Sequence, residues 1–213
     1  MEEIKLETWS PEAENLLAEW SEKASCYRWL HNRCEKKYRK RYYSFSIPVI
    51  VLSTLTGAAN MGISEFIDES DKSMVQAIIG GVNIFAGIIG TLQNFLKVAE
   101  IMESHRAVGV AWSKLGRNIS IELALDPRRR SPAGDFLKLS RAEYDRLIEN
   151  SPMIDDNILN QFKKKFKSAK SSKPSIANGL DVCKIFGRLE QKDLEEIISE
   201  NEEESPDSVD SIP

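Results

Sequence analysis

Two long runs without charged residues interrupt an otherwise highly charged chain. They cover residues 44–63 and 74–96, and neither contains Asp, Glu, Lys or Arg. An α-helix rises about 1.5 Å per residue and the hydrocarbon core of a bilayer is about 30 Å thick, so each run is long enough to cross a membrane as a helix. The pattern predicts two membrane-spanning helices, with residues 64–73 as the connector between them.

An amphipathic helix is predicted before the first run. Ser10 followed by Pro11 is typical of a helix start, because Ser caps free backbone N–H groups and Pro fits the first turn. No Gly or Pro follows before Pro48, so we expect this helix to continue into the first span, with any kink at Pro48. Apolar residues recur every three or four positions, as in a helix with one buried face: Leu16 or Leu17, Trp20, Ala24, Tyr27 and Leu30.

The region after the second run has the same helical spacing, which predicts that the second span extends into a further helix. Its apolar positions are Val98, Ile101, Met102, Val108, Trp112, Leu115, Ile119 and Leu123. The pairs Asp126-Pro127 and Ser131-Pro132 are expected to end that helix. Another helix is predicted over residues 134–150, and Ser151-Pro152 is expected to open the next.

The predicted fold class is therefore all-α, an integral membrane helical hairpin whose helices continue into a helical stalk or bundle. Residues 1–43 form a cytosolic helix and residues 44–96 the hairpin. Residues 97–167 form a cytosolic helical extension. Residues 168–213 contain a linker, a short helix near 180–198 and an acidic tail that is expected to be disordered.

The distribution of charge predicts the orientation of the hairpin. Five basic residues precede the first span: Lys36, Lys37, Arg39, Lys40 and Arg41. The connector is acidic, because it contains one lysine and four acids, Glu65, Asp68, Glu69 and Asp71. Positively charged flanks stay on the cytosolic side of a membrane, so we expect a multi-pass protein with both termini in the cytosol.

A second basic cluster allows two interpretations. Lys163, Lys164, Lys165 and Lys167 are interleaved with Phe162 and Phe166. A charge run of this kind is usually a solvated helix face. The alternative is attraction to anionic lipid, worth about 1 kcal/mol per basic residue near the membrane surface. Nucleic acid is not expected as a partner.

The polar and small residues of the second run form one stripe at alternating spacings of four and three. The stripe contains Gln76, Gly80, Asn83, Gly87, Gly90 and Asn94. A weaker stripe in the first run contains Ser46, Ser53, Gly57 and Asn60. Such a face packs closely against other helices, with amide side chains hydrogen-bonded across the contact, or it lines a pore in an oligomer. The residues alone leave both interpretations open.

Chemistry-bearing residues are few, and no enzyme activity, cofactor or metal is expected. The phosphate-binding, nucleophile-elbow and zinc-protease motifs are absent. Cys26, His31 and Cys34 lie within three helical turns, but a fourth ligand is missing, and the cysteines, with Cys183, suggest no disulfide framework. Neither apolar run contains a titratable acid or base, which argues against a proton-coupled transporter or an ion pump.

The order of these parts resembles the SLATT domain family, whose plan is a helix, a two-span hairpin and a cytosolic helical extension. The resemblance covers about residues 30–165 and rests on the hairpin and on two segments, SHRAVGVAWSKLGRNISIELAL (104–125) and FLKLSRAEYDRLIENSPMI (136–154). It implies a membrane effector that forms pores and is coupled to nucleotide-generating or nucleotide-sensing partners in bacterial conflict systems. Related domains occur in large DNA viruses. No such partner domain is fused here.

Two functional hypotheses follow. In the first, the chain is a homo-oligomer whose second spans line a passive pore or ion channel, because two helices cannot enclose a pathway within one chain. In the second, it is a non-conducting anchor or scaffold, such as a virion or organelle membrane component, whose cytosolic helices bind a protein partner. The stalk further predicts that Trp20, Tyr27, Trp112 and Leu115 are buried between helices.

Overall fold

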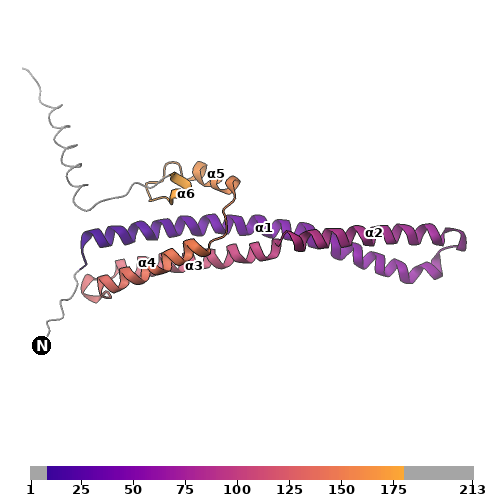
Figure 1. The fold of residues 1–213 in the computed structure, drawn as a ribbon, viewed down its shortest axis with the longest axis horizontal. Helices are drawn as coiled ribbons and strands as arrows, with labels where there is room; N and C mark the ends of the chain where they lie inside the picture. The colour runs from indigo at the N-terminus through magenta and orange to yellow at the C-terminus, as the bar shows by residue number, and fades with distance from the viewer. Residues whose placement is uncertain (1–8, 180–213) are drawn as a thin grey trace, which may run out of the picture. The chain divides into compact units, whose positions relative to one another are not determined.

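The computed structural model describes residues 9–179, and every regular element in that range is a helix. The short helix and acidic tail expected beyond residue 179 lie outside the described residues. Figure 1 shows the order of the elements. They are α1 (Pro11–Phe66), α2 (Glu69–Phe95), α3 (Val98–Ala124), the 3-10 helix η1 (Pro127–Arg129), α4 (Ala133–Asn150), α5 (Asp156–Lys165) and α6 (Ser175–Asn178).

Helix α1 begins and continues as the sequence predicts. Ser10 is its N-cap and accepts a hydrogen bond from the backbone N–H of Ala13 at 3.2 Å. The helix passes through Pro48 without interruption and ends at Phe66. It lies beside α3 over its first part and beside α2 over its second, as Figure 1 shows. One helix therefore connects the N-terminal segment to the first apolar run.

The turn between α1 and α2 is shorter than the expected connector over residues 64–73. Only Ile67 and Asp68 lie between the two helices. Glu69 and Asp71 occupy the first turn of α2 instead of a loop. Carboxylates are favourable there because the N-terminal end of a helix carries partial positive charge. Two of the four acids of the expected connector thus belong to the first turn of a helix.

The expected continuous helix after the second run is interrupted at one point. Leu96 ends α2, and Lys97 adopts the left-handed conformation with φ 48° and ψ 35° before α3 begins. Lys97 is the only non-glycine residue with positive φ among residues 9–179. Left-handed backbone is unfavourable for an L-residue with a Cβ atom, and it breaks the helical hydrogen-bond ladder here.

The core of the molecule lies between the first part of α1 and the helices α3, α4 and α5, and we call these residues (9–43 and 98–177) the bundle. Its buried members are Leu17, Ala24, Tyr27, Leu30, Cys34, Val108, Trp112, Leu115, Ile119, Leu147, Ile158, Phe162 and Ala177. Burial of Tyr27, Trp112 and Leu115 is confirmed, whereas Trp20 is only partly buried. Leu17, not Leu16, faces the core.

Stacked aromatic rings and two glycines account for the close contact of α1 and α3. Tyr27 stacks on Trp112 with ring centroids 4.5 Å apart. A Cβ atom on Gly116 would lie 3.3 Å from the Cβ atom of Ala24, and one on Gly109 would lie 3.0 Å from the side-chain oxygen of Asn32. Glycine therefore allows the close approach at Gly116, where the added atom would press on Ala24 and on the Ser21 backbone, whereas at Gly109 the Asn32 side chain can move aside.

The pair Ser151-Pro152 does not open a helix as the sequence suggested. Ser151 ends α4, and its hydroxyl donates to the carbonyl of Leu147 at 2.6 Å and accepts from Trp112 Nε1 at 3.3 Å. Helix α5 starts after Asp155, whose carboxylate accepts from the backbone N–H of Asn157 at 3.0 Å and pairs with Lys37 of α1. Asp155 therefore both caps α5 and binds this helix to α1.

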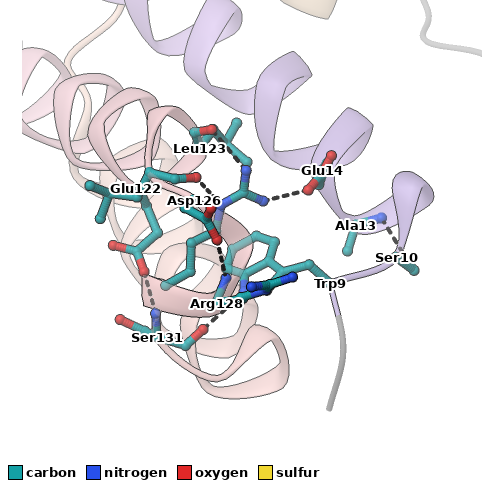
Figure 2. A network of polar contacts seen from close by, with 11 residues as sticks. Trp9, Ser10, Ala13, Glu14, Glu122, Leu123, Asp126, Arg128 and Ser131 are labelled. Atoms are coloured by element: carbon teal, nitrogen blue, oxygen red, sulfur yellow. Dashed lines mark hydrogen bonds and ion pairs between the residues drawn. The ribbon is translucent and has the colours of Figure 1, made fainter. Parts of the chain in front are cut away.

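Figure 2 shows a network of polar contacts that closes the end of the bundle at the start of α1. Arg130 makes several of these contacts. The Arg130 guanidinium donates to the carbonyls of Leu123 and Leu125 at 3.0 and 2.9 Å, pairs with Glu14, and lies over the ring of Trp9. Trp9 Nε1 in turn donates to the carbonyl of Ser131 at 3.0 Å. The break between α3 and α4 is thereby held against the first turn of α1.

The apolar hairpin, residues 44–96, differs sharply from the bundle because most of its large apolar side chains are exposed. Phe95 is 80% exposed, Ile84 68% and Leu55 61%. In each of the two stretches apolar enough to span a membrane, only 11% of the residues are buried. The structure therefore contains two helices that are long and apolar enough to cross a membrane, and neither is the covered core helix of a globular domain.

Candidate functional site

The contact between α1 and α2 uses one face of each helix. Ile79 and Ala86 are the buried residues of α2. Asn83 Oδ1 accepts from Thr56 Oγ1 at 2.6 Å, and Gln93 Nε2 donates to Ser46 Oγ at 2.8 Å. These two bonds satisfy polar groups that would be costly in hydrocarbon.

The glycine and amide stripe of α2 lies beside this contact and not within it. A Cβ atom added to Gly80, Gly87 or Gly90 would meet nothing within 4 Å, and the same holds for Gly57 of α1. Gln76 and Asn94 are exposed, and their side chains form no hydrogen bond within residues 9–179. Asn83 is the one stripe residue that bonds to α1. Ser53 and Asn60 of the weaker stripe are also exposed.

The open stripe is displaced by about one residue from the face that packs on α1. Ile79 and Ala86 each precede a stripe glycine by one position. One residue is a rotation of about 100° around a helix of about 3.6 residues per turn. Helix packing within the chain therefore explains Ile79 and Ala86 but leaves the glycines without a neighbour. Nothing within residues 9–179 therefore makes use of their small size.

The break at Lys97 accounts for this displacement. Four residues of the stripe each lie 18 positions before a residue of α3 that is buried against α1. Eighteen residues are five turns of a helix with about 3.6 residues per turn. The pairs are Gly80 and Val98, Gly87 and His105, Gly90 and Val108, and Asn94 and Trp112. In one uninterrupted helix these residues would share a face. The left-handed residue thus turns the stripe away from α1.

The basic residues before the first apolar run are divided between structure and solvent. Lys37 is bound to Asp155 of α5, and this ion pair holds the pKa of the Asp155 carboxyl below its usual range. Arg39 pairs with Glu35 at 3.4 Å on its own helix. Lys36, Lys40 and Arg41 are exposed. Three of the five predicted interface residues are therefore unengaged at the end of the bundle next to the apolar hairpin.

The second basic cluster lies well away from the start of the apolar hairpin. The Lys165 ammonium is 5.9 Å from the centre of the Trp29 ring, so this part of α5 packs at Trp29. Trp29 precedes Ser44 by 15 residues, or about 22 Å along a helix. Screening at physiological salt limits electrostatic attraction to about 8 Å. The solvated-face interpretation is the one that this geometry favours.

The cysteines and histidines do not converge on one site. The Cys26 thiol donates to the carbonyl of Ser172 at 3.7 Å, while Cys34 is buried in the core and its pKa is raised by burial. Within residues 9–179 no group of three His, Cys, Asp or Glu side chains is arranged to hold a metal ion. Cys183 lies beyond the described range. His31 instead pairs with His105, a contact that sequence reasoning missed although both residues lie on the predicted apolar faces.

No protein family, curated protein or solved structure matches this chain. The resemblance to the SLATT domain family accordingly stays a prediction. The candidate site is defined by the geometry of the hairpin alone: an apolar surface that carries one open face of glycines and amides.

Proposed function

We propose that the chain is an integral membrane protein of two spans, and that several copies assemble so that their α2 helices line a passive pore. The observation that carries the proposal is the open stripe of α2. It combines small residues, which allow close approach, with two amides, Gln76 and Asn94, that have no partner within residues 9–179. The stripe runs from Gln76 to Asn94, almost the whole length of the second apolar run.

The exposed apolar side chains support insertion into a bilayer. Soluble proteins rarely expose apolar patches larger than a few hundred Å². Here Ile78, Phe85 and Leu92 are exposed on the side of α2 opposite to the stripe. In a membrane this side would face lipid, and the exposed Lys36, Lys40 and Arg41 would lie at the cytosolic headgroups.

The amides of the stripe support an assembly of several copies. A carboxamide in hydrocarbon costs several kcal/mol unless its donors and acceptors are bonded. Gln76 and Asn94 have no such bonds within residues 9–179, so other copies or water in a lumen would supply them. The absence of a titratable side chain in either run favours passive conduction over coupled transport.

A non-conducting scaffold is the second candidate, and exposed apolar side chains of the bundle favour it. Val110, Leu139 and Met153 lie outside the apolar hairpin, yet Met153 is 93% exposed. Such residues suit a protein partner on the cytosolic side.

Single-channel recording in planar bilayers separates the two candidates. The purified protein is compared with Asn94→Leu, which removes an amide without breaking a bond in the chain, and with Asn83→Leu, which also removes the bond to Thr56. Phe85→Leu, on the opposite side of α2, is the control. We expect discrete conductance that both Asn variants change and the control does not. A correctly folded oligomer that stays silent would refute the pore and leave the scaffold.

A further inference from the structure

The two histidines of the chain are buried against each other between α1 and α3. His31 and His105 are each fully buried, and their Nδ1 atoms are 2.9 Å apart. The chain contains no other histidine. The pair lies between the aromatic core around Trp112 and the start of the apolar hairpin.

The geometry requires different protonation of the two neutral rings. One hydrogen atom can lie between the two Nδ1 atoms, so one ring carries Nδ1–H and the other accepts with a bare Nδ1 and carries Nε2–H. Neither Nε2 atom has a hydrogen-bond partner within residues 9–179. Each added proton therefore creates a buried N–H group without an acceptor. The second added proton would also place the Nδ1–H groups of the two rings against each other.

Within the described part of the chain, no carboxylate bonds to either ring. Tyr27 stacks on His31 and Tyr38 stacks on His105, with centroids 6.5 and 5.6 Å apart. The nearby acids on each packed helix are already paired: Glu35 with Arg39 on α1, Glu103 with Arg106 on α3, and Asp155 of α5 with Lys37. A buried imidazolium would thus lack a counter-ion.

We propose that the His31–His105 pair is a proton-sensitive latch, which holds α1 against α3 at neutral pH and releases this part of the bundle in acid. This inference does not depend on the proposed pore.

The directions of the pKa shifts of the two histidines agree with this proposal. Burial, with the neighbouring His105 ring, lowers the pKa of His31 to about 4, and burial lowers the pKa of His105. An exposed imidazole has a pKa of about 6.5. The closed contact is therefore fully favoured above about pH 6.5, and it loses stability as the pH falls toward 4, because the open form binds protons that the closed form excludes. His31 alone changes the ratio of closed to open form about tenfold per pH unit in this window.

Nitrogen NMR of protein labelled with ¹⁵N-histidine tests the pair directly, because the spectrum contains only two imidazole rings. At pH 7 we expect one Nδ1–H and one Nε2–H tautomer, both neutral, with titration displaced below pH 6.5. Two identical Nε2–H tautomers that titrate independently near pH 6.5 would overturn the proposal. This measurement uses the unaltered protein and so does not depend on whether a variant folds.

Hydrogen exchange tests the release. Peptides covering residues 26–38 and 101–112 are followed from pH 7 to 5, corrected for intrinsic exchange, in the wild type and in His31→Phe/His105→Leu. We expect opening of the wild type to rise at least tenfold per pH unit below 6.5, and that of the variant less than twofold. Equal pH dependence in both proteins would show that other groups control the opening and would refute the latch.

Discussion

The bundle and the apolar hairpin share the helix α1 but differ in the exposure of their apolar residues. In the bundle, Trp112, Leu30 and Ile119 have no exposed surface. In the hairpin, residues of the same chemical type, such as Ile84 and Phe95, are mostly exposed. The bundle is completed by helices of its own chain, whereas the hairpin lacks any such cover within residues 9–179.

The glycines of the bundle and of the hairpin also differ in their packing. Gly109 and Gly116 lie where α1 and α3 approach each other closely, so a side chain there would collide with Asn32 or Ala24. A Cβ atom added to Gly80 or Gly87 of the hairpin would meet no other atom within 4 Å. Glycine in a helix interior costs about 1 kcal/mol relative to alanine. In the bundle this cost is offset by intrachain packing, whereas no packing within residues 9–179 offsets it at the hairpin glycines.

The largest expected effect is that of truncating the bundle core. Trp112→Ala should lower the free energy of unfolding by about 3 kcal/mol, because it removes a fully buried ring that contacts Tyr27 and Tyr144. Denaturant unfolding followed by tryptophan fluorescence measures it, since all four tryptophans lie in the bundle. Val110→Ala, at a 65% exposed position of the same helix, should change stability by less than about 0.5 kcal/mol. Similar losses for both variants would contradict the described core.

A middle-sized effect compares the two classes of glycine. Gly116→Val should destabilise the bundle by about 1 to 3 kcal/mol through overpacking against Ala24 and Ser21. Gly87→Val should leave the same fluorescence transition unchanged and instead alter oligomer size or conductance. Mass measurement of detergent-solubilised protein, together with bilayer recording, separates these readouts. If Gly87→Val changes neither, the stripe has no role in assembly.

The smallest expected effect concerns the hydrogen bond within the hairpin. Thr56→Val removes the bond to Asn83, and hydrogen bonds between membrane helices contribute about 0.6 kcal/mol on average. Exchange of amide hydrogens in residues 50–60, measured in lipid nanodiscs, should rise about threefold. Thr54→Val is the control, because Thr54 bonds only to the Ile50 carbonyl of its own helix. Equal exchange in both variants would mean that the α1–α2 contact does not rely on this bond.

Local sequence patterns determined the helical type of the longer elements and several of their boundaries. Ser10-Pro11 marked the start of α1, and the apolar spacing around Tyr27 and Trp112 marked the faces that meet in the core. Two uncharged runs marked the hairpin. These features follow from period, capping and length, which depend on neighbours along the chain.

Contacts between distant residues decided the rest. Ser151 ends α4 because Leu147 and Trp112 engage its hydroxyl, and the two histidines form a pair only because α1 lies against α3. The direction of the glycine stripe depends on the left-handed backbone at Lys97, and nothing in the spacing of the stripe reveals that break. The sequence by itself thus determined which residues share a helix face. For the hairpin, only the tertiary structure decided which face of α2 meets α1. Adjacent positions on a helix are about 100° apart, so a change of backbone conformation at one residue is enough to redirect a face.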